Sequence, residues 1–174
     1  MPAFFDLPEP RHVAPGEYPW WDRALALLNQ DLAVTLPQQK PLRLRALPPV
    51  GGDEAEQVCV TLANGDWHGN YLCPSSADDA ASALAAVADA GQETVIECLW
   101  QVWPLCTEHG LGAHPRDAEG QLVWWCAGER QRDGRSHILA RVGALDTLIR
   151  PHRPHRKPKP GSHPKSNPKP KRAR

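Results

Sequence analysis

The last 25 residues of the chain restrict what it can fold into more than any other segment. Residues 150–174 contain seven prolines, ten Lys or Arg residues and no aromatic residue. Prolines at this density prevent helix and sheet formation and favour polyproline II. The segment also lacks the apolar side chains that would offset its loss of conformational entropy. We therefore predict that residues 150–174 form a disordered basic tail outside any core.

This tail makes the formal net charge of zero misleading. It holds ten of the 20 Lys and Arg residues and none of the 20 Asp and Glu residues, so its charge is about +10 and that of residues 1–149 about −10. Flexible cationic segments attract phosphate backbones by counterion release. We expect weak, salt-sensitive binding of a polyanion or nucleic acid, although no aromatic residue is present to stack on a base. The alternative is a solubilising tail that folds back loosely on the acidic body.

The rest of the chain has the pattern of one α+β domain over residues 17–149, preceded by a proline-rich extended arm over residues 1–16. The first helix is predicted from Pro19 to about Val34, because proline fits the first helical turn. Apolar residues then recur there at steps of three and four, as on one helix face: Trp21, Ala24, Leu25, Leu28 and Leu32.

Three short segments after this helix have the composition of β-strands. They are residues 42–47, 57–62 and 67–72. The pair Asn64-Gly65 between the second and third is a strong signal for a hairpin turn. We predict a three-stranded antiparallel meander from this order.

A second helix is predicted from Ala77 to Trp103, capped by Ser75 or Ser76 and ended by Pro104. Gly91 lies in its middle and costs a helix about 1 kcal/mol. The alternative is a break at Gly91, with the β-branched residues from Thr94 starting a strand. We favour one continuous helix.

The C-terminal part, residues 104–147, is predicted to be a β-hairpin unit. Its strands are residues 121–126 and 136–142, joined by a polar stretch. Two adjacent tryptophans, Trp124 and Trp125, lie on the first of these strands, so their side chains must point to opposite faces. For the adjacent pair Trp20 and Trp21 in the first predicted helix, the sequence likewise leaves open whether both side chains are buried. Any tryptophan of the two pairs that is not buried would contribute to a protein-binding patch.

The same unit contains a candidate zinc site. Cys106 and His109 form a C-x2-H pair, Cys126 ends the first hairpin strand, and His137 begins the second. Zinc prefers four such thiolate and imidazole ligands in a tetrahedron. A tight turn can supply the first two ligands, and a hairpin can bring the other two beside them. Two further candidates in the sequence are Cys98 and His114.

The alternative interpretation has Cys106 and Cys126 as small buried residues, with both histidines on the surface. Ten residues separate Cys126 from His137, which matches no tight knuckle. From the sequence alone this interpretation is favoured, because a metal site requires all its ligands to converge.

The C-terminal segments resemble small uncharacterised proteins of high-GC Gram-positive bacteria. The resemblance is carried by Trp103-Pro-Leu-Cys-Thr-Glu-His109, by Val123-Trp-Trp-Cys126 and by the segment 138–145. It covers about the last third of the folded body. It implies a shared fold unit and assigns no role to any residue. The excess of Ala, Arg, Pro and Gly is likewise typical of a GC-rich bacterial genome.

The sequence gives little support to an enzyme. It lacks the nucleophile-elbow, P-loop, dinucleotide-binding and H-E-x-x-H motifs. Cys73 or Cys59 with His68, and Cys106 with His109, could be written as nucleophile–base pairs, but a chain with five Cys and eight His offers such pairs by chance. We predict a non-catalytic binding or adaptor protein that works through a protein partner, with a nucleic-acid-associated protein as the alternative.

Location is predicted from what the N-terminus and the cysteines indicate. We find no signal-peptide pattern at the N-terminus and no apolar run of membrane-spanning length. The five cysteines form no regular framework, which favours reduced thiols. We therefore expect a cytoplasmic protein with no membrane association.

Overall fold

The computed structural model describes residues 9–49, 55–128 and 134–149. Its helices and strands confirm the predicted α+β class. In chain order they are β1 (Arg11–His12), α1 (Pro19–Thr35), β2 (Arg43–Leu47), β3 (Gln57–Thr61), the short 3-10 helix η1 (Pro74–Ala77), α2 (Ala80–Leu99), β4 (Leu105–Cys106), β5 (Leu111–Gly112), β6 (His114–Ala118), β7 (Gln121–Cys126), β8 (His137–Arg141) and α3 (Asp146–Ile149). The predicted basic tail and the first half of the predicted arm lie outside the described residues.

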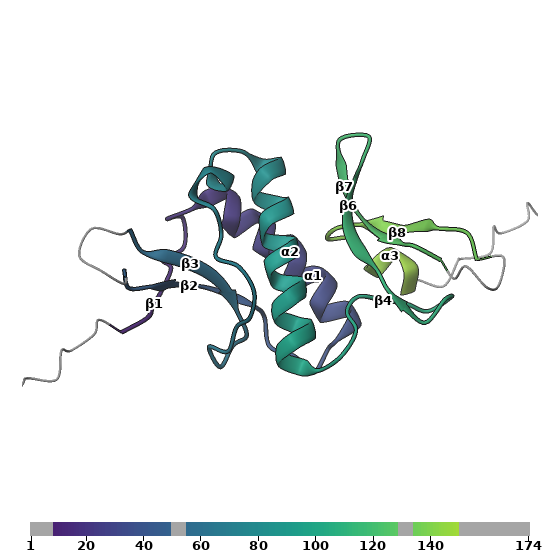
Figure 1. Ribbon diagram of the computed structural model, residues 1–174, viewed down its shortest axis with the longest axis horizontal. Helices are drawn as coiled ribbons and strands as arrows, with labels where there is room; N and C mark the ends of the chain where they lie inside the picture. Colours follow the sequence, from purple (N-terminus) through teal and green to yellow (C-terminus); the bar gives the residue numbers. More distant parts are fainter. Residues whose placement is uncertain (1–8, 50–54, 129–133, 150–174) are drawn as a thin grey trace, which may run out of the picture.

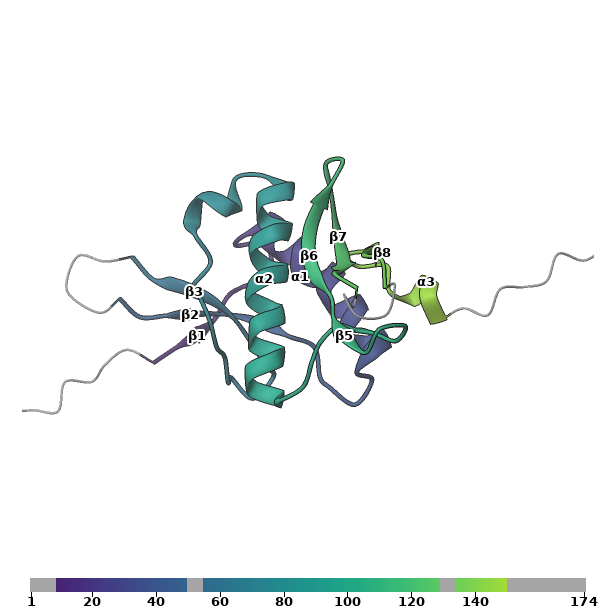
Figure 2. The same ribbon diagram turned by 45° about the vertical axis from the view of Figure 1, so that its right-hand side comes forward.

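The two long helices lie between two small sheets. Figures 1 and 2 show α1 and α2 in the centre, with β1–β3 on one side and β6–β8 with α3 on the other. The core runs through all three layers and includes Leu28 of α1, Val87 of α2, Val60 of β3 and Trp124 of β7. No described helix is long and apolar enough to cross a membrane.

Helix α1 begins and ends as its sequence predicts. Pro19 occupies its first turn, and the Asp22 carboxylate accepts a hydrogen bond from the Gly16 amide at 2.7 Å. Trp21 and Leu28 are buried on the face toward the core. Trp20 is only partly buried, with the Arg23 guanidinium 4.7 Å above its ring.

The first sheet is three-stranded, but its third strand was predicted wrongly. Its order is β1-β2-β3, all antiparallel, so the extra strand comes from the N-terminal arm. Residues 67–72 form no strand: Gly69 has a φ of 94°, which breaks the extended path. The Leu72 amide still donates to the Val58 carbonyl at 2.7 Å, so this segment covers the outer edge of β3.

Helix α2 starts later and ends earlier than predicted. Its N-cap is Asp79, whose carboxylate accepts from the Ala81 and Ser82 amides at 2.9 Å, whereas Ser75 and Ser76 belong to η1. The helix stops at Trp100, which has a φ of 53° and a side chain that is 89% exposed. The four residues before Pro104 therefore lie outside the helix, which ends at the left-handed conformation of Trp100.

The predicted continuity of α2 through Gly91 is confirmed, and the structure gives a reason for this glycine. A Cβ atom built at position 91 would collide with Leu28 Cδ2 of α1 and would touch Leu42. Glycine thus permits the close approach of the two helices at this point, despite its low helix propensity.

The C-terminal sheet contains the predicted hairpin of β7 and β8. The structure adds β6, which pairs with the other side of β7 to give the order β6-β7-β8. Trp124 points into the core and is fully buried, whereas Trp125 is partly exposed beneath the Arg116 guanidinium, 4.6 Å from its ring. The opposite orientation of the two tryptophans is therefore confirmed.

Candidate metal centre

The short hairpin formed by β4 and β5 brings the C-x2-H pair together. The Gly110 amide donates to the Cys106 carbonyl at 2.8 Å, and Gly110 has the positive φ that this tight turn requires. The chain therefore folds back after Cys106 and returns His109 to it. Cys106 Sγ lies 3.6 Å from His109 Nδ1.

The hairpin of β7 and β8 supplies the other two predicted ligands. Cys126 and His137 face each other as partners in this ladder, although ten residues separate them in the sequence. Cys126 Sγ lies 3.5 Å from His109 Nδ1, and His137 Nε2 lies 3.6 Å from Cys106 Sγ. The contacts thus link all four predicted ligands, but Cys126 does not belong to the group whose ligand atoms all lie within 4.8 Å of one another.

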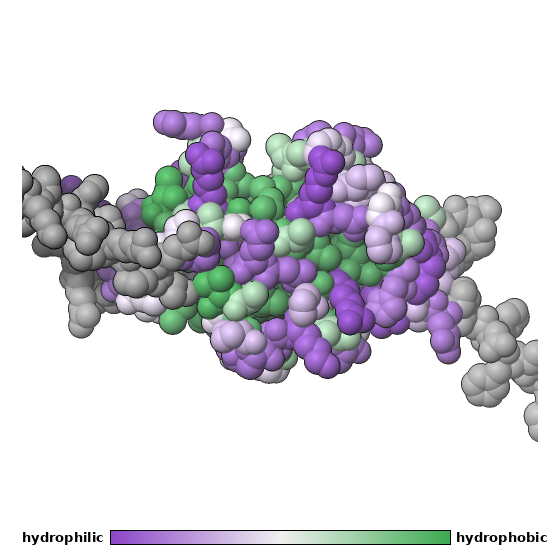
Figure 3. Space-filling view, turned by 180° about the vertical axis from the view of Figure 1, so that it is seen from behind, coloured by the Kyte–Doolittle hydropathy of each residue, from purple (hydrophilic) through white to green (hydrophobic). Residues whose placement is uncertain are grey.

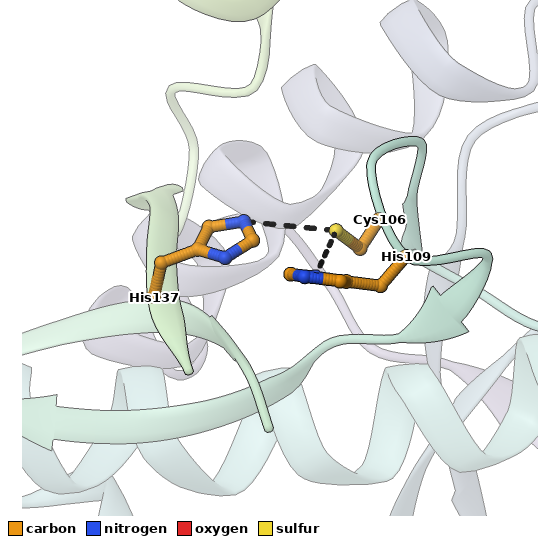
Figure 4. Close-up of side chains that lie close together, drawn as sticks. All are labelled: Cys106, His109 and His137. Carbon is orange, nitrogen blue, oxygen red and sulfur yellow. Dashed lines mark hydrogen bonds between the residues drawn. The ribbon is translucent and has the colours of Figure 1, made fainter. Parts of the chain in front are cut away.

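Three of these residues form a compact donor set. The ligand atoms of Cys106, His109 and His137 all lie within 4.8 Å of one another and could hold a metal ion. Figure 4 shows the three side chains pointing toward one another, from the β4–β5 hairpin and from the start of β8. Cys126 extends the set through its contact with His109.

The two cysteines of the candidate site are more deeply buried than its two histidines. The two cysteines are 2% and 0% exposed, and the histidines are partly buried. Burial raises the pKa of the Cys126 thiol, and the neighbouring Cys106 thiol raises it further. The Cys126 thiol is therefore kept neutral unless a nearby cation compensates its ionisation.

A second layer of contacts orients the His137 ring. Its Nδ1 faces the Arg135 carbonyl at 3.5 Å, and its Nε2 also lies 3.8 Å from a carboxylate oxygen of Glu108. A proton on Nδ1 is donated to that carbonyl and leaves the Nε2 lone pair free for a metal. This arrangement is common around histidine ligands.

The β4–β5 hairpin is held against α2 by one buried side chain that the sequence reasoning missed. The amide nitrogen of Gln92 donates to the Trp103 carbonyl at 2.9 Å and to the Ala113 carbonyl at 2.6 Å. These two carbonyls flank the hairpin on both sides. A glutamine on the buried face of a helix was the available signal, because buried amides require partners.

A second missed residue, Asp31 of α1, connects the helices to the C-terminal sheet. It is fully buried and accepts from the Trp124 indole at 2.7 Å, from the Gly143 amide at 2.6 Å and from the Leu145 amide at 2.8 Å. Burial raises the pKa of Asp31, whereas the three donors act in the opposite direction. Its position one helical turn after Leu28, on the apolar face, was the signal in the sequence.

The remaining candidates lie elsewhere. His114 is exposed on β6 and Cys98 lies partly buried on α2, and neither belongs to the Cys106–His109–His137 set. Cys73 contacts the Ser75 hydroxyl at 3.1 Å and Cys59 the Arg45 carbonyl at 3.7 Å, whereas the described ion pair of His68 is with Glu93 at 3.7 Å. These contacts give no support to a pairing of Cys73 or Cys59 with His68.

Comparison with protein-family models, with curated proteins and with solved structures finds no match to this chain.

Proposed function

We propose that the protein is a zinc-stabilised, non-catalytic binding module, in which Cys106, His109, Cys126 and His137 bind one Zn2+ ion. The observation that carries this proposal is the convergence of two thiols and two imidazoles from two separate hairpins. A pair of cysteines and a pair of histidines is a common ligand set of structural zinc sites.

The distances between the donors support a tetrahedral site. Zn–S bonds of about 2.3 Å and Zn–N bonds of about 2.05 Å place a sulfur and a nitrogen of one tetrahedron about 3.6 Å apart. Three of the four sulfur–nitrogen pairs in this protein are 3.6, 3.6 and 3.5 Å apart. These three distances therefore match those of a tetrahedral zinc site, whereas Cys126 would have to move closer to the other donors to complete it.

The four-ligand set also favours a structural over a catalytic role. Catalytic zinc sites use three protein ligands and leave a fourth position for water or substrate. Here a fourth protein donor, the fully buried Cys126 thiol, lies 3.5 Å from His109 Nδ1. We infer that zinc fastens the β4–β5 hairpin to β7 and β8, and that this unit presents a surface to a protein partner.

Metal analysis of the full-length protein, purified without a histidine tag, tests the proposal. We expect one zinc per chain by mass spectrometry, and none in Cys106→Ser or Cys126→Ser. The matched control is Cys98→Ser, which also removes a thiol from a partly buried position and should retain the metal. Replacement by Co2+ should give the absorption of a tetrahedral site with two thiolates. A folded, metal-free wild-type protein would disprove the proposal.

The tail carries the second candidate function, polyanion binding. Ten cationic residues without one acidic residue over 150–174 support it. Retention on heparin or DNA resin should decrease steeply with salt and disappear when residues 150–174 are deleted. Retention that survives the deletion would exclude the tail as the binding element.

The five free cysteines support a reducing compartment, so we infer that the protein works in the cytoplasm.

A further inference from the structure

An open apolar groove lies next to the candidate metal centre. Its volume is about 410 Å3, and its walls come from the β4–β5 hairpin, from β8 and from α3. Three of its lining side chains are large aliphatic groups that are about half exposed: Leu105 at 49%, Ile138 at 51% and Leu148 at 55%. Apolar surface is visible at this end of the molecule in the view from behind (Figure 3). Exposed apolar groups gathered around one groove indicate a binding surface.

The chain itself supplies a segment at the edge of this groove. The described residues end at Ile149, directly after Leu148, which lines the groove. The next seven residues are Arg-Pro-His-Arg-Pro-His-Arg, a three-residue repeat over 150–156. Polyproline II has three residues per turn, so in this conformation Pro151 and Pro154 share one face and the arginines share another. At about 3.1 Å per residue, the segment spans roughly 20 Å.

The charge of the groove suits this segment. Its described lining residues include the carboxylate of Glu108 and no Lys or Arg. Proline faces that dock on apolar grooves lose little conformational entropy, because polyproline II is already extended in the free chain. An arginine on the other face can then pair with the Glu108 carboxylate.

We propose that residues 150–156 of the same chain dock in this groove, with Pro151 and Pro154 on the aliphatic side chains and the arginines toward Glu108. The inference goes beyond the zinc proposal and does not depend on which metal is bound. The remaining, more distal part of the tail stays available for other partners.

NMR relaxation on the full-length, 15N-labelled protein tests the docking. The heteronuclear NOE of the amides of residues 152, 153, 155 and 156 should be clearly higher than that of residues 165–174. Ile138→Glu and Leu105→Glu each remove an apolar side chain from the wall of the groove. Either change should reduce the NOE of these four amides to the level of residues 165–174. Val102→Glu is the matched control, because Val102 is 53% exposed and does not line the groove.

Changes in the tail itself keep the test independent of folding. Pro151→Ala with Pro154→Ala should release the segment, whereas Pro168→Ala with Pro170→Ala should leave its NOE unchanged. Equal mobility of residues 150–156 and 165–174 in the wild type would refute the proposal. An NOE that rises with protein concentration, together with dimers by light scattering, would also overturn it, because the segment would then belong to a second copy. Metal content measured on the same samples reports separately on the zinc site.

Discussion

At the scale of single residues, a few buried polar groups determine how the layers of this protein are joined. Asp31 connects α1 to β7 and to the segment before α3 through three donors. Gln92 joins α2 to both sides of the β4–β5 hairpin. Buried groups of this kind stabilise a fold only while their partners remain, since an unpaired buried donor loses its hydration without compensation.

Replacing Asp31 by asparagine tests this connection. Asp31→Asn puts an amide NH2 group where one carboxylate oxygen now accepts hydrogen bonds, so at least one buried N–H loses its partner. We expect the free energy of unfolding to decrease by about 2–4 kcal/mol, measured by urea denaturation. Asp89→Asn, on the exposed side of α2, is the control and should change it by less than about 0.5 kcal/mol. Equal effects of the two changes would contradict the role of Asp31.

The cysteines of the candidate metal centre give a second prediction at this scale. Cys106→Ser should remove the metal and lower the free energy of unfolding by about 3–5 kcal/mol, because loss of a metal site is among the largest effects of single substitutions. Cys98→Ser should lower it far less. Thermal unfolding of zinc-loaded samples, with metal content determined in parallel, measures both. A Cys106→Ser protein with unchanged stability would show that the thiol is only a packed side chain.

At the scale of secondary-structure elements, the packing of α1 against α2 and the attachment of the N-terminal strand are the features that the sequence reveals least directly. The two helices approach closely at Gly91, where Leu28 occupies the space of a side chain. Strand β1 is only two residues long, yet its Arg11 side chain reaches both Glu17, before α1, and Glu56, before β3. A short strand is thus held by an ion-pair network on the surface.

The helix contact predicts an unusual result for a glycine in a helix. Gly91→Ala should destabilise the protein by about 1–3 kcal/mol through overpacking, although alanine is the better helix former by about 1 kcal/mol. Leu28→Ala combined with Gly91→Ala should recover part of this loss, because the shorter side chain makes room for the new Cβ atom. A double-mutant cycle by chemical denaturation measures the coupling. Additive effects would mean that the two residues do not compete for space.

The surface network predicts an acid-dependent loss of stability. The Arg11 guanidinium, and then the Ala14 amide, lower the pKa of Glu17 from 4.5 to about 2. Because the folded-state pKa is the lower one, the stabilisation is complete above pH 4.5 and is lost as the pH falls toward 2. Unfolding curves of the wild type and of Glu17→Gln should therefore converge across this window. A difference that stays constant with pH would exclude ionised Glu17 as its source.

At the scale of the whole molecule, the helices separate two sheets that differ in how they are held. The sheet of β1–β3 packs its aliphatic side chains on α2, whereas the C-terminal sheet surrounds the Cys and His cluster at its end. The small β4–β5 hairpin buries few side chains apart from Cys106. Its stability should therefore depend strongly on the metal.

Metal removal should act on one side of the molecule only. After treatment with a zinc chelator we expect faster amide hydrogen exchange in β4, β5, β7 and β8, and little change in β2 and β3. Acidification should have the same local effect, because protons compete with the metal for thiolate and imidazole ligands. Mass-spectrometric hydrogen exchange resolves these segments. Uniform loss of protection would show that the metal stabilises the whole fold at once, and no loss would argue against a structural site.

The sequence by itself determined the features that rest on local chemistry. The period of the apolar residues and Pro19 predicted α1, and strand-like composition predicted β2, β3, β7 and β8. Each of these depends on residues that are neighbours along the chain. The sequence alone also identified candidate metal ligands by residue type: Cys106, His109, Cys126 and His137.

Only the tertiary structure decided which of these pieces meet. The N-terminal arm, and not residues 67–72, provides the third strand of the first sheet, because Gly69 turns the chain there. Ten residues separate Cys126 from His137, and only strand pairing places the two opposite each other. The partners of Asp31 lie 93 to 114 residues away. Such contacts follow from how whole elements pack, and no local spacing encodes them.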